Sequence, residues 1–258
     1  MKDFTRILWV SEQARSVWEG RLYKIHQYLL EMERLACKMG RVAIQFIYPD
    51  KLPELVLWAQ KENLIVLPLD IESGSSSYRS SSSPYVNGLP WTMRVAITPP
   101  EHVDRMIRAW REKDEIEIGN RLGYPPCCRR FFDRVWRKER KIDTTWDMYS
   151  GNAQGPIECN ILLRWLGARL VPHLPCSFAC RRTVDFANSF NDESRQEYEW
   201  ICEMLSWPVE WSALHGIARI KTPICEVMTR TDYTAEKKLV RRLGDIYPKE
   251  AARAGTPP

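Results

Sequence analysis

Four of the eight cysteines in this 258-residue chain stand in two short segments that share a local design. The four are Cys127, Cys128, Cys176 and Cys180. In each segment a proline precedes the first cysteine, and proline favours the first turn of a helix. Free N–H groups and the helix dipole at such a position stabilise the thiolate, which binds metals and acts as a nucleophile. The pattern predicts a metal site, with a redox dithiol or simple burial as the alternatives.

The spacing within each pair decides how the thiolates can share a metal. Cys176 and Cys180 would lie on one helix face, whereas the adjacent Cys127 and Cys128 diverge by about 100° in a regular helix. Joint binding therefore requires one of the adjacent pair to lie in an irregular first turn. Four such thiolates could hold a 4Fe–4S cluster or a tetrahedral zinc ion, although the spacing is that of neither a ferredoxin nor a zinc ribbon. Cys159, at the start of a further predicted helix, is a reserve ligand.

Basic side chains crowd the first cysteine pair. Residues 121–141 carry eight of them against only Asp133 and Glu139. A cluster held by four thiolates is an anion that nearby cations stabilise, so this charge favours iron–sulfur over zinc. The same charge would suit an anionic substrate. Four arginines beside the cysteines are predicted to bind it: Arg129, Arg130, Arg181 and Arg182.

Three polar residues near the second pair are candidate catalytic groups. His173 follows an apolar run, residues 168–172, that is predicted to be a strand, and strand-to-helix junctions often carry ligands and catalytic groups. His173 could transfer a proton or bind metal, or it could hydrogen-bond a loop carbonyl. Asn160 and Arg164, one helical turn apart, could hold a carboxylate or phosphate, or form an ordinary polar helix face.

Composition sets the class of protein. With 38 Lys+Arg against 33 Asp+Glu, the net charge of +5 is too small to indicate nucleic acid by itself. The chain is 44% hydrophobic and can bury one large core or two small ones. No apolar run approaches the roughly 18 residues that span a membrane, and the first residues lack a secretory apolar region. We therefore expect a cytoplasmic protein without membrane contact, whose cysteines are thiols or ligands.

Hydrophobic periodicity predicts the elements that position the cysteines. An apolar stripe predicts a helix over residues 11–39, ended by Gly40. A β-α-β unit follows over 41–69, with a parallel strand pair and no glycine-rich phosphate loop. Further along the chain the pattern predicts a strand over 91–98, helices over 99–113 and 115–122, β pieces over 207–229 and a basic helix over 235–243.

Together these elements predict an α/β or α+β fold. An N-terminal helix and β-α-β unit precede a helix-rich, cysteine-bearing region that ends in a β hairpin or meander. Residues 1–100 are expected to form a scaffold with a serine-rich loop over 73–83, and residues 101–248 the cysteine-motif region. The tail over 249–258 is expected to fray, and the two regions could form one continuous domain.

Residues 115–225 resemble a prokaryotic paired-cysteine family that has no established reaction. Its pattern, LGYPxCCxxF, NxxLRxxG and HxPCSxxC, is matched by residues 122–131, 160–167 and 173–180. The resemblance implies that the four cysteines and His173 act as a unit. A weaker resemblance to the cysteine-pair modules of heterodisulfide reductases rests on an adjacent pair with a distant second pair. This chain lacks their glycine after the pair, which argues against a non-cubane cluster.

These features favour a cytosolic iron–sulfur enzyme that acts on a small anionic molecule by sulfur transfer, Lewis-acid or redox chemistry. Such an enzyme would require an electron or sulfur donor protein for some of these reactions. One alternative is a zinc-stabilised module that binds nucleic acid through its basic patch and exposed aromatics such as Trp136 and Trp146. Another is a thiol redox protein with a cysteine pair across the two motifs, since adjacent cysteines form a strained ring.

Overall fold

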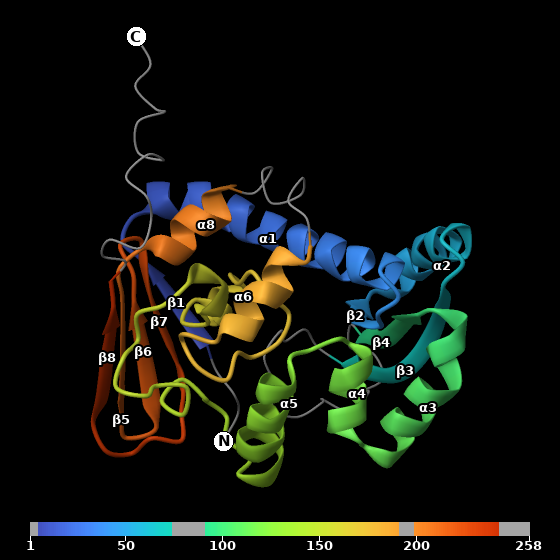
Figure 1. Ribbon diagram of the computed structural model, residues 1–258. Coiled ribbons are helices and arrows are strands. Elements are labelled where there is room, and N and C mark those ends of the chain that lie inside the picture. Colours follow the sequence, from blue (N-terminus) through green and yellow to red (C-terminus); the bar gives the residue numbers. More distant parts are fainter. Residues whose placement is uncertain (1–4, 74–90, 191–198, 243–258) are drawn as a thin grey trace.

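A computed structural model describes residues 5–73, 91–190 and 199–242. Nearly all of the serine-rich segment predicted over 73–83, and all of the tail predicted over 249–258, lie outside these ranges. Two antiparallel sheets stand at opposite ends of the molecule, and the cysteine-bearing segments lie between them (Figure 1). The predicted mixed α/β class is confirmed.

The longest helix, α1 (Glu12–Lys38), extends across both ends of the molecule (Figure 1). Ser11 caps its first turn by accepting a hydrogen bond from the Ala14 N–H at 3.0 Å. Its apolar stripe is buried in the larger core, and Gly40 after its end adopts a φ of +79°. The helix predicted over 11–39 is therefore confirmed.

The smaller sheet has the strand order β2-β4-β3, formed by β2 (Ala43–Ile47), β4 (Trp91–Thr98) and β3 (Ile65–Ser73). Both β2 and β3 are antiparallel to β4, and α2 (Leu52–Lys61) connects them. The β-α-β unit is thus present, but the predicted direct pairing of its strands is wrong. The physical reason is that β4 carries the most deeply buried run of the sheet, Val95 to Ile97, and so takes the central place between them.

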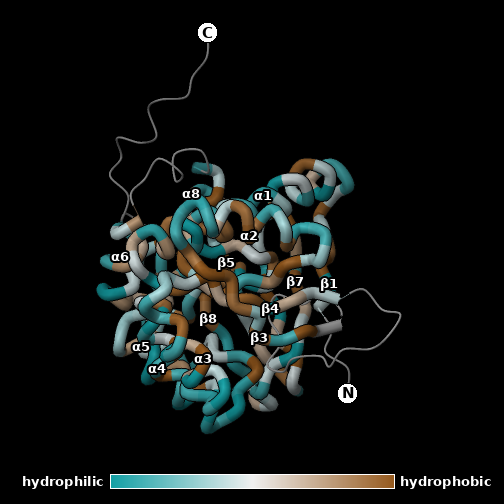
Figure 2. The backbone as a smooth tube through the Cα atoms, turned by 90° about the vertical axis from the view of Figure 1, so that its right-hand side faces the viewer, coloured by the Kyte–Doolittle hydropathy of each residue, from teal (hydrophilic) through white to brown (hydrophobic). Residues whose placement is uncertain are grey.

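Two helices pack on this sheet and lead to the first cysteine pair. After a short 3-10 turn (Pro100–His102) come α3 (Val103–Glu112) and α4 (Glu115–Arg121), close to their predicted positions. Their buried residues Met106, Ala109 and Ile118 pack with Ala96 of β4 in one cluster. Figure 2 shows the hydrophobic residues concentrated along the central strands and the hydrophilic residues along these outer helices.

The larger sheet has five strands in the order β1-β7-β6-β5-β8. They are β1 (Thr5–Trp9), β5 (Val209–Leu214), β6 (Ile217–Lys221), β7 (Cys225–Arg230) and β8 (Lys237–Arg241). The predicted C-terminal meander is confirmed in β5, β6 and β7. The helix predicted over 235–243 is wrong, because burial alternates at Leu239 and Arg241 with the period of a strand.

The larger core lies between this sheet, α1 and residues 131–190, and it includes α8 (Glu199–Ser206). It contains Trp18 and Ile25 of α1 as well as Trp211 of β5. The division predicted near residue 100 stays a prediction, but β1 and α1, which precede it, pack with the cysteine-bearing region. Among the helices of the described ranges, none is both long and apolar enough to cross a membrane.

Candidate metal centre

The adjacent cysteines lie in the first turn of α5 (Pro126–Phe132), directly after Pro126 at its first position. This is the placement that the proline predicted. Cys128 is buried and Cys127 is half-buried. Beyond Phe132 the helix widens into a π-helical turn (Asp133–Lys138). Both cysteines lie in regular α-helix, so the expected irregular turn is not needed: their side chains bring the two sulfurs to within 3.8 Å of each other.

The second pair has a different local structure from the one predicted. The helix α6 begins at Arg181 and ends at Asn188, with Cys180 as its N-cap residue, so Cys176 lies in a loop before it. The strand predicted over 168–172 is likewise absent: these described residues form bends and irregular structure. Around Cys176, the reason for the difference is the buried Phe178: its carbonyl packs directly on Gly155 and holds the loop in a turn. The turn still aims both sulfurs at one point.

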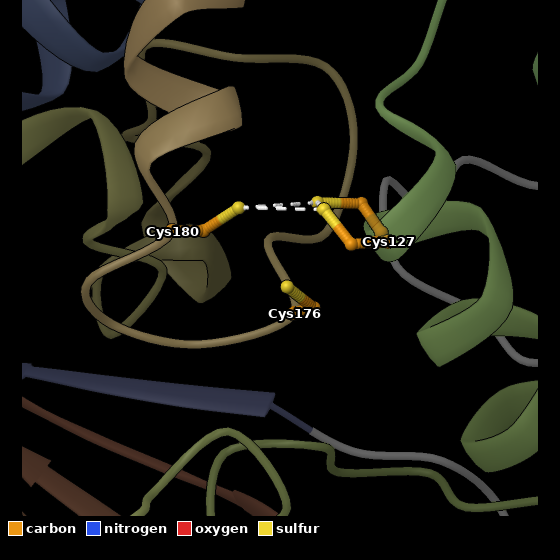
Figure 3. Close-up of side chains that lie close together, drawn as sticks. Cys127, Cys176 and Cys180 are labelled. Atoms are coloured by element: carbon orange, nitrogen blue, oxygen red, sulfur yellow. Dashed lines mark hydrogen bonds between the residues drawn. The ribbon is translucent and has the colours of Figure 1, made fainter.

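The four sulfurs converge on one centre (Figure 3). All of them lie within 4.8 Å of one another. The sulfur of Cys180 is 3.8 Å from that of Cys127 and 3.7 Å from that of Cys128, and the adjacent pair is separated by 3.8 Å. Four thiolate donors at such distances can bind a metal ion. The prediction that these four cysteines come together in one group that could hold a metal ion is confirmed.

Hydrogen bonds among the thiols concentrate negative charge on one of them. The pKa of Cys180 is lowered, because Cys128 and then Cys176 hydrogen-bond to its sulfur. The pKa of Cys128 is raised by its hydrogen bonds with Cys176 and then with Cys180, and by burial. Burial raises the pKa of Cys159 to about 12, and its thiol donates to the Cys180 carbonyl at 3.4 Å. Cys159 therefore packs beside the four and is not one of the converging ligands.

His173 reaches the centre through a threonine. Its Nε2 lies 3.0 Å from Oγ1 of Thr183, and that oxygen lies 3.5 Å from the sulfur of Cys128. Tyr124 and Phe186 pack against the imidazole with ring centroids at 5.1 and 4.9 Å. Burial lowers the pKa of His173 to about 3, so the ring is neutral near pH 7. This geometry supports a positioning role more than the predicted proton transfer.

Asn160 and Arg164 make structural contacts. Asn160 donates to the Leu205 carbonyl at 2.7 Å and accepts from the Leu162 N–H at 3.0 Å. Arg164 forms a buried ion pair with Asp143 at 2.7 Å. Their predicted catalytic role remains untested, but these bonds direct their polar groups into the core.

The arginines around the cysteines occupy three kinds of place. Arg130 and Arg134 line a surface hollow of about 360 Å³ together with Cys127, Phe131 and Cys176. Arg181 and Arg182 are exposed in the first turn of α6. Arg129 instead packs on Gly119 and donates to the Ile116 carbonyl at 3.4 Å. The predicted anion-binding residues thus lie near the cysteines, but Arg129 has a structural contact of its own.

The sequence reasoning missed two residues beside the candidate sites. Thr183 follows Cys180 by three residues, one turn into α6, and that spacing could have indicated a contact with the centre. Asp143 lies 21 residues before its partner Arg164, and no sequence signal joined the two. A scan against protein-family models and searches of curated proteins and of solved structures found no match for this chain.

Proposed function

We propose that the chain is a metalloprotein in which Cys127, Cys128, Cys176 and Cys180 bind a single tetrahedral ion, zinc being the best match. The observation that carries the proposal is the separation of the sulfurs. Zinc–sulfur bonds of about 2.3 Å in tetrahedral geometry place the sulfurs about 3.8 Å apart. The three separations among Cys127, Cys128 and Cys180, 3.7, 3.8 and 3.8 Å, agree with that distance. The sulfur of Cys176 lies within 4.8 Å of the other three.

A 4Fe–4S cluster, which the sequence favoured, fits this arrangement less well. In a cubane each thiolate binds a different iron, so the iron and sulfide atoms lie between the thiolates and hold them apart. Sulfurs near van der Waals contact leave no room for those atoms. An iron–sulfur cluster here would require α5 and the loop around Cys176 to separate. The basic residues of α5 support either reading, because a zinc ion with four thiolates also has a net negative charge.

The number of ligands supports a structural role for the metal. Four cysteines fill the coordination sphere of a tetrahedral ion and leave no open position for water or substrate. The ion would join α5 to the loop before α6, two segments that lie about 50 residues apart in the chain. Its binding free energy would then contribute to folding, as in small zinc domains. We therefore favour a metal that stabilises the structure around the site over a metal that takes part in catalysis.

The test is the metal and acid-labile sulfide content of protein purified anaerobically. We expect about one zinc and no sulfide per chain, with loss of the metal in Cys128→Ser and Cys180→Ser. Cys159→Ser is the matched control, since this thiol is buried beside the centre but outside it. Replacement by Co(II) should give the visible bands of a tetrahedral thiolate site. Iron with an equal amount of sulfide, or metal retained in both serine variants, would contradict the proposal.

A further inference from the structure

The four cysteines are buried unequally, so the centre has a closed face and an open face. Cys128 and Cys180 are 2% and 6% exposed, and Thr183 and Cys159 pack against them. Cys127 and Cys176 are half-buried and form part of the wall of the hollow described above. Of the four cysteines, Cys127 and Cys176 alone line the hollow, so the hollow marks the open face of the centre.

Positive charge exceeds negative charge around this open face. Arg130 and Arg134 both line the hollow, and within the described residues Arg130 forms no ion pair. Arg134 stacks over Phe131 at 5.5 Å and is 4.0 Å from Glu139, a distance at which an exposed ion pair contributes little. The two guanidinium groups balance a centre of one divalent ion and four thiolates.

A positive surplus remains once the centre is neutralised. Arg181 and Arg182, exposed in the two positions after Cys180, supply it, since no ion pair is formed by either one within the part of the chain that the structure describes. Asp185, three and four residues further along the same helix, offsets part of this charge. The positive charge that remains near the cysteines would attract an anion.

We propose that this hollow binds a small molecule that carries a phosphate or carboxylate group. The planar forks of Arg130 and Arg134 match both oxyanions. The volume of about 360 Å³ lies within the range of small-ligand pockets. The proposal deepens the proposed function, because the ligand would lie against the two thiolates of the open face, but it depends only on the positions of the arginines.

The aromatic side chains favour a small ligand over a nucleic acid strand. Base stacking requires exposed rings, and Trp136 and Trp146 were the candidates from the sequence. Both are half-buried: Trp136 stacks on Phe132 at 5.9 Å, and Trp146 stacks on Trp211 at 6.2 Å. The exposed faces that a strand would need are therefore largely occupied by neighbouring rings.

The test is calorimetric titration of the metal-loaded protein with pyrophosphate, with citrate and with a single-stranded RNA of mixed sequence. We expect pyrophosphate or citrate to bind, and the double variant Arg130→Gln/Arg134→Gln to weaken that binding at least about tenfold. Arg105→Gln/Arg108→Gln is the matched control, since both residues are exposed on α3, away from the hollow-lining set. It should bind as the natural protein does.

A second measurement is the rate of alkylation of the two cysteines on the open face. Iodoacetate carries a carboxylate and iodoacetamide does not. The arginines should therefore raise the rate at which iodoacetate alkylates Cys127 and Cys176, relative to the rate of iodoacetamide. Pyrophosphate should protect both. Absence of binding by both small anions, binding of RNA alone, or an unchanged reagent ratio in the arginine variant would overturn the proposal. A measured metal content of zero would overturn the metal centre instead, since the arginine variant leaves every cysteine in place.

Discussion

Thr183 stands between His173 and the metal-binding cysteines, with its hydroxyl oxygen 3.0 Å from Nε2 of the imidazole. Because Nδ1 of His173 is buried and has no hydrogen-bond partner among the described residues, the neutral ring is best placed with its proton on Nε2. That proton is donated to the threonine oxygen. The threonine hydroxyl is then free to donate to the sulfur of Cys128, 3.5 Å away. The histidine thus orients a hydrogen bond to a thiolate without contacting it.

This relay makes a prediction about metal affinity. Thr183→Val keeps the shape of the buried side chain and removes the donor, so zinc should bind about tenfold more weakly, in line with the effect of other outer contacts at metal sites. Thr183→Ser keeps the hydroxyl and should retain most of the affinity. Competition with a chromophoric chelator measures both, and the Co(II) spectrum should shift only in the valine variant. Equal affinity in the two variants would argue against the relay.

The sequence was sufficient to predict features that depend on residues close together in the chain. The apolar stripe of α1 and the proline before Cys127 each specify a local structure, and both appear as predicted. The four cysteines could be grouped because they occur in two similar segments. The serine-rich loop and the frayed tail could not be compared, since nearly all of these residues lie outside the described ranges.

Long-range pairing was not accessible from the sequence. The strand β1 pairs with β7 across more than 200 residues, and β4 enters between two strands that precede it. Neither pairing leaves a periodic signal, because tertiary burial decides it. The loop of Cys176 was mistaken for a helix for the same reason: contact between Phe178 and the distant Gly155 overrides the local preference after a proline.

Gly155 should be intolerant of any side chain. A Cβ built on it would overlap the carbonyl oxygen of Phe178, a backbone atom that cannot move without shifting the loop of Cys176. The Gly155 carbonyl also accepts a hydrogen bond from Arg241 at 2.5 Å. We expect Gly155→Ala to lower the free energy of unfolding by at least about 2 kcal/mol and to weaken metal binding.

The matched control for Gly155 is Gly20 in α1, where a Cβ meets nothing within 4 Å. Gly20→Ala should raise the free energy of unfolding by about 0.5–1 kcal/mol, because glycine disfavours helix interiors. Urea denaturation and metal titration of both variants check the pair. A Gly155→Ala protein with natural stability and metal affinity would show that the loop contact is not required.

Glu33 should make stability fall as pH rises toward neutrality. Burial on α1 raises the pKa of this carboxyl from 4.5 to about 7, despite the opposing effects of Arg169 and Gln45. The folded state therefore binds more protons than the unfolded state between these values, and the contribution is fully present below pH 4.5 and lost as pH rises through 7.

Glu33→Gln removes this dependence. The free energy of unfolding of the variant, relative to the natural protein, should rise with pH by about 3 kcal/mol before it levels off. Urea denaturation in excess metal, repeated across this range and one unit above, measures the difference. Glu19→Gln, exposed on the same helix, controls for the loss of a helix charge. A difference for Glu33→Gln that does not vary with pH would refute the prediction.

Variants of the ion pair between Arg164 and Asp143 can distinguish a structural role of Arg164 from a substrate-binding role. Arg164 also donates to Thr145 and to the Ile161 carbonyl, both at 3.0 Å, so its charge is fully enclosed. Asp143→Ala would leave that charge buried without its partner, and should cost about 3–5 kcal/mol of unfolding free energy. Asp143→Leu/Arg164→Leu, which removes both charges, should lose clearly less than the two single changes added together.

Metal content and pyrophosphate binding complete the comparison at this pair. If Arg164 is structural, the folded double variant should keep both at natural levels, because neither residue belongs to the cysteine group or to the lining of the hollow. If Arg164 instead holds the substrate anion, as its position in the motif suggested, the same variant should lose pyrophosphate binding while it remains folded. The two readings therefore give opposite results in one titration, with the unfolding curve as the check that the protein under test is native.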